Sequence, residues 1–180
     1  DPTAGGRVFT LTQVVDTGGG ATDTATLSGV TSTIGVTPVN DVPTLTATAT
    51  NNTFTEGAGT AQGAAVLVFS GATVSAVESA QLIKSLTFTV SGLLDGSSEM
   101  VTVDGSTFAL AAGTGTTTTN SMSYSVSFAS GTATVTLTKT AGIASSAAQT
   151  LVNGIQYQNT NVNDPTAGGR VFTLTQVVDT

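Results

Sequence analysis

The stretch Asp1 to Thr17, DPTAGGRVFTLTQVVDT, returns letter for letter as Asp164 to Thr180. An identity over 17 residues at an offset of 163 residues indicates a tandem repeat, because chance does not produce it. Sequence drift normally erodes repeats, so we expect the natural chain to contain runs of nearly identical units of about this period. Near-identical repetition favours a structural function, in which the number of repeats sets the length of the protein.

The frame of the repeat is set by a segment that resembles an interdomain linker, VTPVNDVP at residues 36–43. Pro38 and Pro43 bracket an Asn-Asp pair, and each proline removes a backbone donor and fixes φ, which ends strand pairing. We therefore predict a domain boundary near residue 43. In this frame residues 1–43 are the last part of one unit with its linker, and residues 44–180 are the next unit without its final strand.

The rest of the sequence has the period of β-strands. Thr alternates with apolar residues in LTATAT at residues 45–50 and in ATVTLT at residues 133–138, which is the two-residue period of a strand. Turn-bounded segments of this kind, without a strand-helix-strand rhythm, favour an all-β fold, namely an antiparallel Greek-key β-sandwich with at most one short helix near residues 145–152. The expected strands are residues 24–37, 44–50, 64–69, 82–91, 99–103, 106–111, 122–129, 132–139, 155–158 and 170–178.

Several polar motifs have structural interpretations. Asp104-Gly105 and Ser130-Gly131 lie between alternating runs and predict tight hairpins. The Thr-rich run from Gly113 to Asn120 predicts a flexible loop. Asp95 and Glu99, four residues apart in DGSSE, suit calcium or acid-base chemistry, but a solvated turn is favoured because the spacing does not reproduce a calcium-binding loop.

A few isolated side chains are expected to have structural roles. Arg170, one of four cations, is expected to pair with a carboxylate or with loop carbonyls at the end of the sandwich. Tyr124 and Tyr157 are expected to pack with a satisfied hydroxyl group rather than to bind a ligand.

Composition excludes several classes of function. Eleven Asp and Glu against four Lys and Arg give a net charge of -7, which excludes a basic face for nucleic acid. The sequence contains no run of about 20 apolar residues, so we expect no membrane span in this segment. Cys and His are absent, which removes thiol nucleophiles, most zinc sites and imidazole bases. We therefore predict that the protein is not an enzyme.

Two segments resemble bacterial cadherin-like or Ig-like tandem repeats. GIQYQNT at residues 154–160 with NDPTAGGRVFTL at 163–174 is similar to the ending of such repeats, and VTPVNDVPTLT at 36–46 is similar to their joint. TFTEG at 53–57 and residues 74–82 resemble further family segments. The resemblance implies a cadherin-like or Ig-like sandwich in the extender region of a giant adhesin of the repeats-in-toxin type. Such proteins are exported to the bacterial cell surface and mediate adhesion and biofilm attachment.

The resemblance also implies calcium at the joint between repeats. The sequence departs from the family pattern near residues 76–78, where Ala76 and Glu78 stand in place of two aspartates. Losing an aspartate removes one oxygen ligand from a site that needs six to eight. The candidate calcium ligands are Asn40, Asp41, Glu56, Asp16, its copy Asp179, and Glu78.

Three other functions compete with that of a spacer repeat. One is a subunit of an extracellular filament or sheath, built by strand exchange between repeats. A ligand-binding module and an enzyme are the others.

The expected partners are neighbouring identical repeats, arranged head to tail. Because the frame leaves one strand missing, residues 18–43 of one molecule are expected to dock beside residues 170–178 of another.

Overall fold

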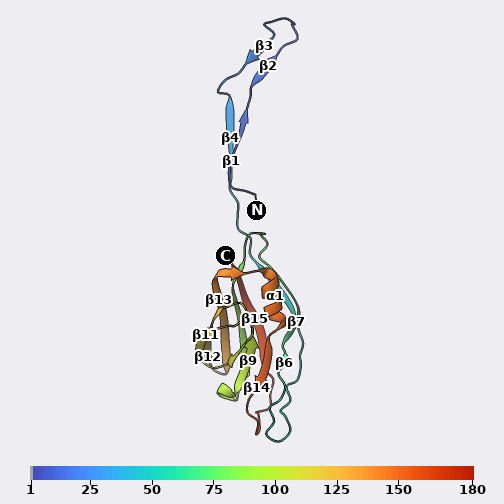
Figure 1. Ribbon diagram of the computed structural model, residues 1–180, viewed down its shortest axis with the longest axis vertical. Coiled ribbons are helices and arrows are strands. Elements are labelled where there is room, and N and C mark those ends of the chain that lie inside the picture. The colour runs from blue at the N-terminus through green and yellow to red at the C-terminus, as the bar shows by residue number, and fades with distance from the viewer. Residues whose placement is uncertain (1) are drawn as a thin grey trace. The chain divides into compact units, whose positions relative to one another are not determined.

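The computed structural model describes residues 2–180; Asp1, the first residue of the repeated stretch, lies outside the described residues (Figure 1). The fold is mainly β, with several antiparallel sheets and one short α-helix. The chain divides into two compact units, the first ending at Asn40 and the second spanning Asp41–Thr180. Among the described residues no helix is long and apolar enough to cross a bilayer.

The first unit consists of two paired strand segments. β1 (Gly5–Thr10) pairs with β4 (Thr31–Val36), and β2 (Gln13–Val15) pairs with β3 (Thr24–Thr26), both antiparallel. Its larger apolar side chains are exposed instead of gathered in a core. These exposed residues are Val8, Phe9, Leu11, Val14, Val15, Val30, Ile34 and Val39.

The second unit contains a five-stranded sheet in the order β11-β12-β13-β8-β15. All neighbours in this sheet are antiparallel, and β8 lies between β13 and β15. The bounds are β8 (Ile83–Ser91), β11 (Gly113–Thr116), β12 (Ser123–Ala129), β13 (Thr132–Ile143) and β15 (Val171–Asp179). The repeated stretch therefore supplies the last strand of this sheet.

A four-stranded sheet and a two-stranded sheet complete the second unit. The four-stranded order is β10-β9-β14-β6, and β5 pairs with β7. The bounds are β5 (Thr44–Ala49), β6 (Val66–Leu67), β7 (Phe69–Ser75), β9 (Glu99–Val103), β10 (Ser106–Ala109) and β14 (Gln156–Asn159). A 3-10 turn, η1 (Gly96–Ser98), precedes β9, and α1 (Ser145–Asn153) contacts β7. The short helix predicted near residues 145–152 is confirmed.

Both predicted hairpin turns are confirmed. Asp104 and Gly105 have φ of 51° and 78°, and they connect β9 to β10. Ser130 and Gly131 have φ of 49° and 73°, and they connect β12 to β13. Positive φ at both central residues matches the twist of the flanking strands, and glycine adopts it without steric cost.

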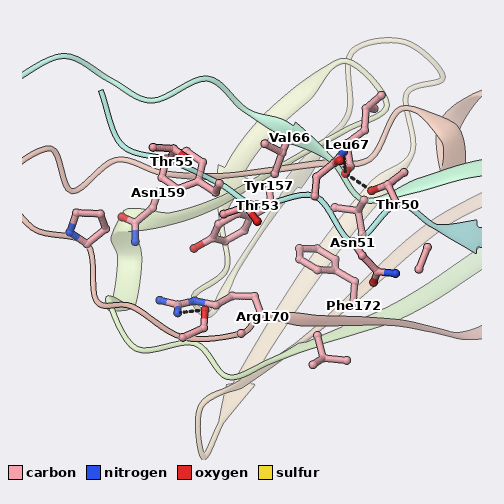
Figure 2. Close-up of a pocket in the computed structure, with 18 of the residues that line it drawn as sticks. Thr50, Asn51, Thr53, Thr55, Val66, Leu67, Tyr157, Asn159, Arg170 and Phe172 are labelled. Carbon is pink, nitrogen blue, oxygen red and sulfur yellow. Dashed lines mark hydrogen bonds between the residues drawn. The ribbon is translucent and has the colours of Figure 1, made fainter. Parts of the chain in front are cut away.

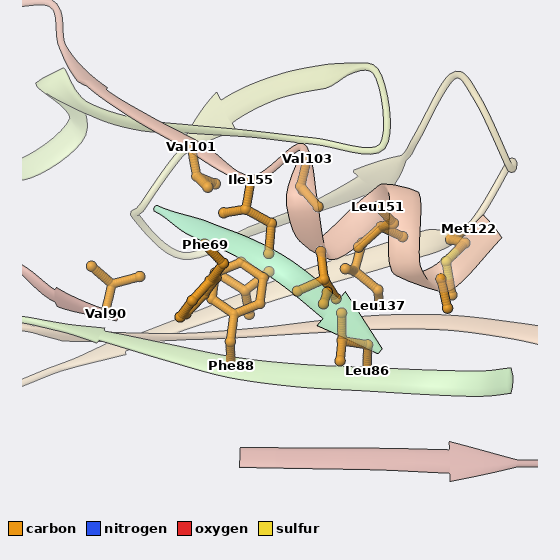
Figure 3. Close-up of a cluster of buried hydrophobic side chains, with 14 of the residues drawn as sticks. Phe69, Leu86, Phe88, Val90, Val101, Val103, Met122, Leu137, Leu151 and Ile155 are labelled. Carbon is orange, nitrogen blue, oxygen red and sulfur yellow. The ribbon is translucent and has the colours of Figure 1, made fainter. Parts of the chain in front are cut away.

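One apolar core fills the second unit. Figure 3 shows side chains from several elements meeting there: Phe88 from β8, Leu137 from β13, Val101 from β9 and Leu151 from α1. The alternation in β13 explains the arrangement, because Ala133, Val135 and Leu137 are buried while the threonines between them are half-buried. Each large side chain fully buried in this way contributes about 1.5–3 kcal/mol.

Threonines of the two-stranded sheet and of the four-stranded sheet pair with each other across neighbouring strands. The hydroxyls of Thr46 and Thr73 lie 2.6 Å apart, and those of Thr102 and Thr107 lie 2.7 Å apart. Such cross-strand pairs each add a fraction of a kcal/mol. They explain how a sequence with few charges and many threonines forms outward-facing strands.

Three strands differ from the sequence-based expectation. The single strand expected at residues 24–37 is divided into β3 and β4, with residues 27–30 between them. β7 extends to Ser75, whereas the predicted strand ended at residue 69, and β11 forms within the run that was expected to be a flexible loop. β11 pairs with β12, and Gly115 lies beneath the Tyr124 ring, where an added Cβ would come within 2.6 Å of ring atoms. Pairing and this close approach, which only glycine permits, override the weak strand propensity of Gly-Thr-Gly-Thr.

Candidate functional site

Glu99, the first residue of β9, is completely buried. Its Oε1 accepts hydrogen bonds from the Tyr157 hydroxyl at 2.9 Å and from Arg170 Nε at 2.5 Å. Its Oε2 accepts the backbone N–H of Leu94 at 2.9 Å. A buried carboxylate is stable only when it is paired and hydrogen-bonded in this way.

Asp95 lies beside Glu99 and is held by a second set of donors. Asn159 Nδ2 donates to Oδ2 at 2.5 Å, and the backbone N–H of Thr166 donates to the same oxygen at 2.9 Å. Thr166 Oγ1 donates to Oδ1 at 2.5 Å, and Arg170 Nη2 lies 3.4 Å from Oδ2. We refer to Asp95, Glu99, Tyr157, Asn159 and Arg170 as the Glu99 cluster.

Arg170 joins the two carboxylates. Its side chain is only 7% exposed, and its Nη1 also donates to the carbonyl of Gly168 at 2.9 Å. The prediction that Arg170 pairs with carboxylates and loop carbonyls is confirmed. The prediction that Tyr157 packs with a satisfied hydroxyl is also confirmed, because the hydroxyl donates to Glu99 and the ring lies edge-on to Phe54 and Phe172.

The environment shifts the pKa of three groups in the cluster. Burial alone would raise the pKa of Asp95, but hydrogen bonds from Thr166 and Asn159 and the charge of Arg170 together lower it. Burial and the neighbouring Glu99 raise the pKa of the Tyr157 hydroxyl. Burial alone would lower the pKa of Arg170, but its hydrogen bond to Glu99 and nearby negative charge raise it. The arginine and the tyrosine therefore stay protonated at neutral pH.

The expectation that Asp95 to Glu99 forms a solvated turn is wrong. Gly96–Ser98 does form a short 3-10 turn, but both carboxylates point inward to partners that lie 58 to 75 residues away along the chain. Each of their oxygens accepts from protein donors. The arrangement holds the start of β9 against β14 and the approach to β15.

A second buried carboxylate, Asp104, holds the loop that follows β11. It accepts hydrogen bonds from Thr117 Oγ1 at 2.5 Å and from Asn120 Nδ2 at 2.5 Å. Lys139 Nζ donates to the carbonyl of Asn120 at 2.6 Å. The sequence predicted the Asp104 turn but not its side-chain partners. All buried side-chain nitrogen and oxygen atoms among residues 2–180 are hydrogen-bonded.

An open groove lies between the start of β15 and the segment that follows β5 (Figure 2). Its volume is about 720 Å³. Tyr157, Arg170 and Phe172 lie along one part of it, and Val66 and Leu67 along another. The complete lining is residues 49–56, 66–69, 157, 159 and 165–172.

The candidate calcium ligands of the second unit are not all gathered at one place. Asp41 and Glu78 are brought together, since the Asp41 backbone N–H donates to Glu78 Oε1 at 2.8 Å. Asp179 is buried at the end of β15, where its strand pairs with Ile83. Glu56 is exposed and lines the groove.

The remaining two candidates belong to the first unit. Asp16 is exposed, and its Oδ1 accepts the backbone N–H of Gly18 at 2.9 Å. Asn40 is the last residue of that unit. Within residues 2–180, no three Asp or Glu side chains gather closely enough to hold a metal ion. A calcium site with six to eight oxygens would therefore need ligands from a neighbouring repeat or from backbone and water.

Comparisons with protein-family models, with curated proteins and with solved structures found no match.

Proposed function

We propose that the chain is a structural repeat of a large secreted or cell-surface bacterial protein, and that it spaces an adhesive region away from the cell. The observation that carries the proposal is the exact return of a 17-residue stretch at an offset of 163 residues. The second copy of the repeated stretch is a strand of the folded unit, so repetition of the sequence means repetition of the domain. The number of domains copied in tandem would set the length of the whole protein.

We interpret the five-stranded and four-stranded sheets as the two layers of a β-sandwich. The support is the shared core, to which β8, β12 and β13 contribute from one sheet and β9, β10 and β14 from the other. In this proposal the Glu99 cluster has a structural role, because its carboxylates are occupied by protein donors. It would hold the end of the sandwich at which a following repeat is attached.

Small-angle X-ray scattering of chains with one, two and three periods tests the spacer function. We expect monomers whose longest dimension increases linearly, by about 40 Å per period, since roughly twelve extended residues define the length of the sandwich. Clustered, globular particles whose dimension grows with the cube root of mass would contradict the proposal.

Calcium at the joint is a further part of the proposal. The groove end of one repeat, which carries Glu56, would face Asn40, Asp41 and Glu78 of the following repeat. A ligand that binds only the native state raises its stability by mass action. In a two-period chain we therefore expect a higher Tm with calcium than with chelator, and loss of the difference in Asp41→Ala. Equal Tm values would remove calcium from the proposal and leave the spacer function intact.

A further inference from the structure

The outer edge of β15 has no partner strand among residues 2–180. β15 is the last strand of the five-stranded sheet, with β8 on its inner side. A strand edge of this kind presents unpaired backbone donors and acceptors, and natural sheets usually cover it. The groove runs along the segment that leads into β15 and along the first residues of this edge, from Gly168 to Phe172.

The first copy of the same sequence shows which strand fits this edge. There the Asp16 N–H donates to the Asp23 carbonyl on the β3 side. In the second copy the next N–H, that of Thr180, donates to the Leu82 carbonyl on the β8 side. Successive N–H groups of an extended strand point to opposite edges. β3 therefore binds the edge that β15 leaves open. Leu174, the copy of Leu11, faces the interior as Asp179 does, and residues of a strand that share a face point their N–H groups to the same edge. Because the Leu11 N–H donates to the Val30 carbonyl, β4 also binds the open edge, and its pairing does not compete with that of β8.

The register of the first copy also places side chains. Ile34 lies opposite Arg7, and Val36 lies opposite Gly5. Transferred to the second copy, Ile34 lies opposite Arg170 and Val36 opposite Gly168. Side chains on one face of a strand alternate, so Val30, Ile34 and Val36 would share the face on which Arg170, Phe172 and Leu174 turn toward the interior.

The groove is complementary to that apolar face. Phe54, Val66, Phe69 and Phe172 are among the residues that line it. In the first unit Ile34 is 55% exposed and Val30 is 44% exposed, so the apolar face of β4 is uncovered there. Thr31 and Thr33 occupy the opposite face, which would remain in solvent.

We propose that the groove beside β15 is a binding site for the strand Val30–Val36 of a second copy of this chain. The strand would add to the sheet in the register that β4 makes with β1. The proposal goes beyond the spacer function and does not depend on it, since it concerns only the edge of one folded unit.

Chain length prevents the strand Val30–Val36 from reaching the groove of the unit that directly follows it in the same chain. Asp41 is bonded to Glu78, the Gln81 N–H donates to the Glu78 carbonyl, and the Thr180 N–H donates to the Leu82 carbonyl. Asp41 and Thr180 therefore lie at the same end of the unit. Val36 would need to lie opposite Gly168, about 40 Å away along the strand. The five residues from Val36 to Asp41 span at most about 18 Å.

Exchange is favoured because backbone hydrogen bonds are replaced one for one while apolar surface is buried. β4 leaves β1 and binds the same sequence in β15, so its backbone pairing is conserved. The gain is burial of Val30, Ile34 and Val36. The contact joins unlike surfaces of two copies, so it continues as an open chain.

The first test is sedimentation velocity of the 180-residue chain over a hundredfold range of concentration. We expect higher oligomers at high concentration. In Ile34→Asp, a charge enters the apolar groove, and we expect association to weaken at least tenfold. The matched control Thr33→Asp puts the same charge on the solvent face and should associate as the wild type does. Equal behaviour of the two variants would overturn the proposal.

A second variant tests the site without requiring exchange. The sequence of residues 18–43 is appended after Thr180, so the strand follows its partner as it does in the first copy. We expect this chain to stay monomeric and its Tm to rise by about 5–10 °C, and the Ile34→Asp change in the appended copy to abolish the rise. An unchanged Tm, or a rise that survives this change, would show that the groove does not bind the strand.

Discussion

The two copies of the 17-residue stretch have one sequence and two environments. In the first copy Phe9 is 61% exposed, and among residues 2–180 Arg7 donates to two nearby carbonyls, those of Thr3 and Gly5. In the second copy Phe172 stacks on Phe88 with centroids 6.3 Å apart, and Arg170 binds Glu99. The difference shows that burial of these side chains is conferred by β8 and β9, not by the stretch itself.

Some features are common to both copies and are therefore local. Each arginine donates to the carbonyl two residues before it, Gly5 in the first copy and Gly168 in the second. Both copies also interrupt their strand pairing in the same segment. β1 ends at Thr10 and β2 begins at Gln13, and in the second copy the register shifts between Leu174 and Gln176, the counterparts of Leu11 and Gln13. Local sequence thus determines the backbone path, and tertiary partners determine the stability.

The largest expected difference between the copies concerns the two arginines. Arg170→Ala leaves Glu99 buried without its cation, and we expect a loss of about 3–5 kcal/mol in the free energy of unfolding. Arg7→Ala removes an exposed side chain and should change it by less than about 0.5 kcal/mol. Urea denaturation of both variants measures the pair.

Arg170→Lys serves as a further control, because it keeps the charge but loses the planar fork that reaches both carboxylates. We expect it to recover only part of the loss. Equal effects of Arg7→Ala and Arg170→Ala would mean that the Glu99 cluster does not stabilise the second unit.

The two phenylalanines should differ by a smaller amount. Phe172 is half-buried and contacts Phe88 and Tyr157, so Phe172→Ala should cost about 2 kcal/mol, less than truncation of a fully buried ring. Phe9→Ala should leave the free energy of unfolding almost unchanged in the monomeric chain. Thermal unfolding of the two variants at a concentration where the chain is monomeric provides the comparison. A large effect of Phe9→Ala would mean that the first unit has a core of its own.

The smallest effect is the dependence of stability on pH through Asp95. Its folded-state pKa is lowered, so the unfolded chain binds this proton more readily. The stabilisation is fully present above the unfolded pKa of about 3.9 and is lost as pH falls through the folded value. We expect the unfolding free energy of Asp95→Asn to depend less on pH below about pH 4 than that of the wild type. The exposed control Asp164→Asn should follow the wild type.

Sequence patterns predicted the elements that depend on neighbours in the chain. The alternation at Ala133 to Thr138, the Asp104-Gly105 turn and the helix at Ser145–Asn153 are of this kind. The burial of Glu99 depends on Tyr157 and Arg170, which lie 58 and 71 residues away, and a single sequence carries no direct signal of such contacts. The one indication in the sequence was that Tyr157 and Arg170 lie in the same segment, residues 154–174, on which the resemblance to tandem repeats rests.

The groove could not be predicted from residue types, because it lies between segments far apart in the sequence. Residues 49–56 and 165–172 have unremarkable composition, and only the paired sheets bring them near each other.

Cysteine cross-linking tests the strand-binding claim most directly, because the chain contains no cysteine of its own. The Leu11 N–H donates to the Val30 carbonyl, and hydrogen-bonded and non-hydrogen-bonded pairs alternate along an antiparallel ladder. Val8 and Thr33, three positions further along the same register, are therefore a non-hydrogen-bonded pair. The Cα atoms of such a pair lie about 4.5 Å apart, a distance that a disulfide can span. The chain carrying Thr33→Cys and Val171→Cys should form a ladder of disulfide-linked oligomers on mild oxidation. The control with Thr33→Cys and Thr173→Cys, two residues out of register, should give far fewer. Equal yields from the two registers, or monomers from both, would contradict the binding of one copy's strand to the next copy's groove.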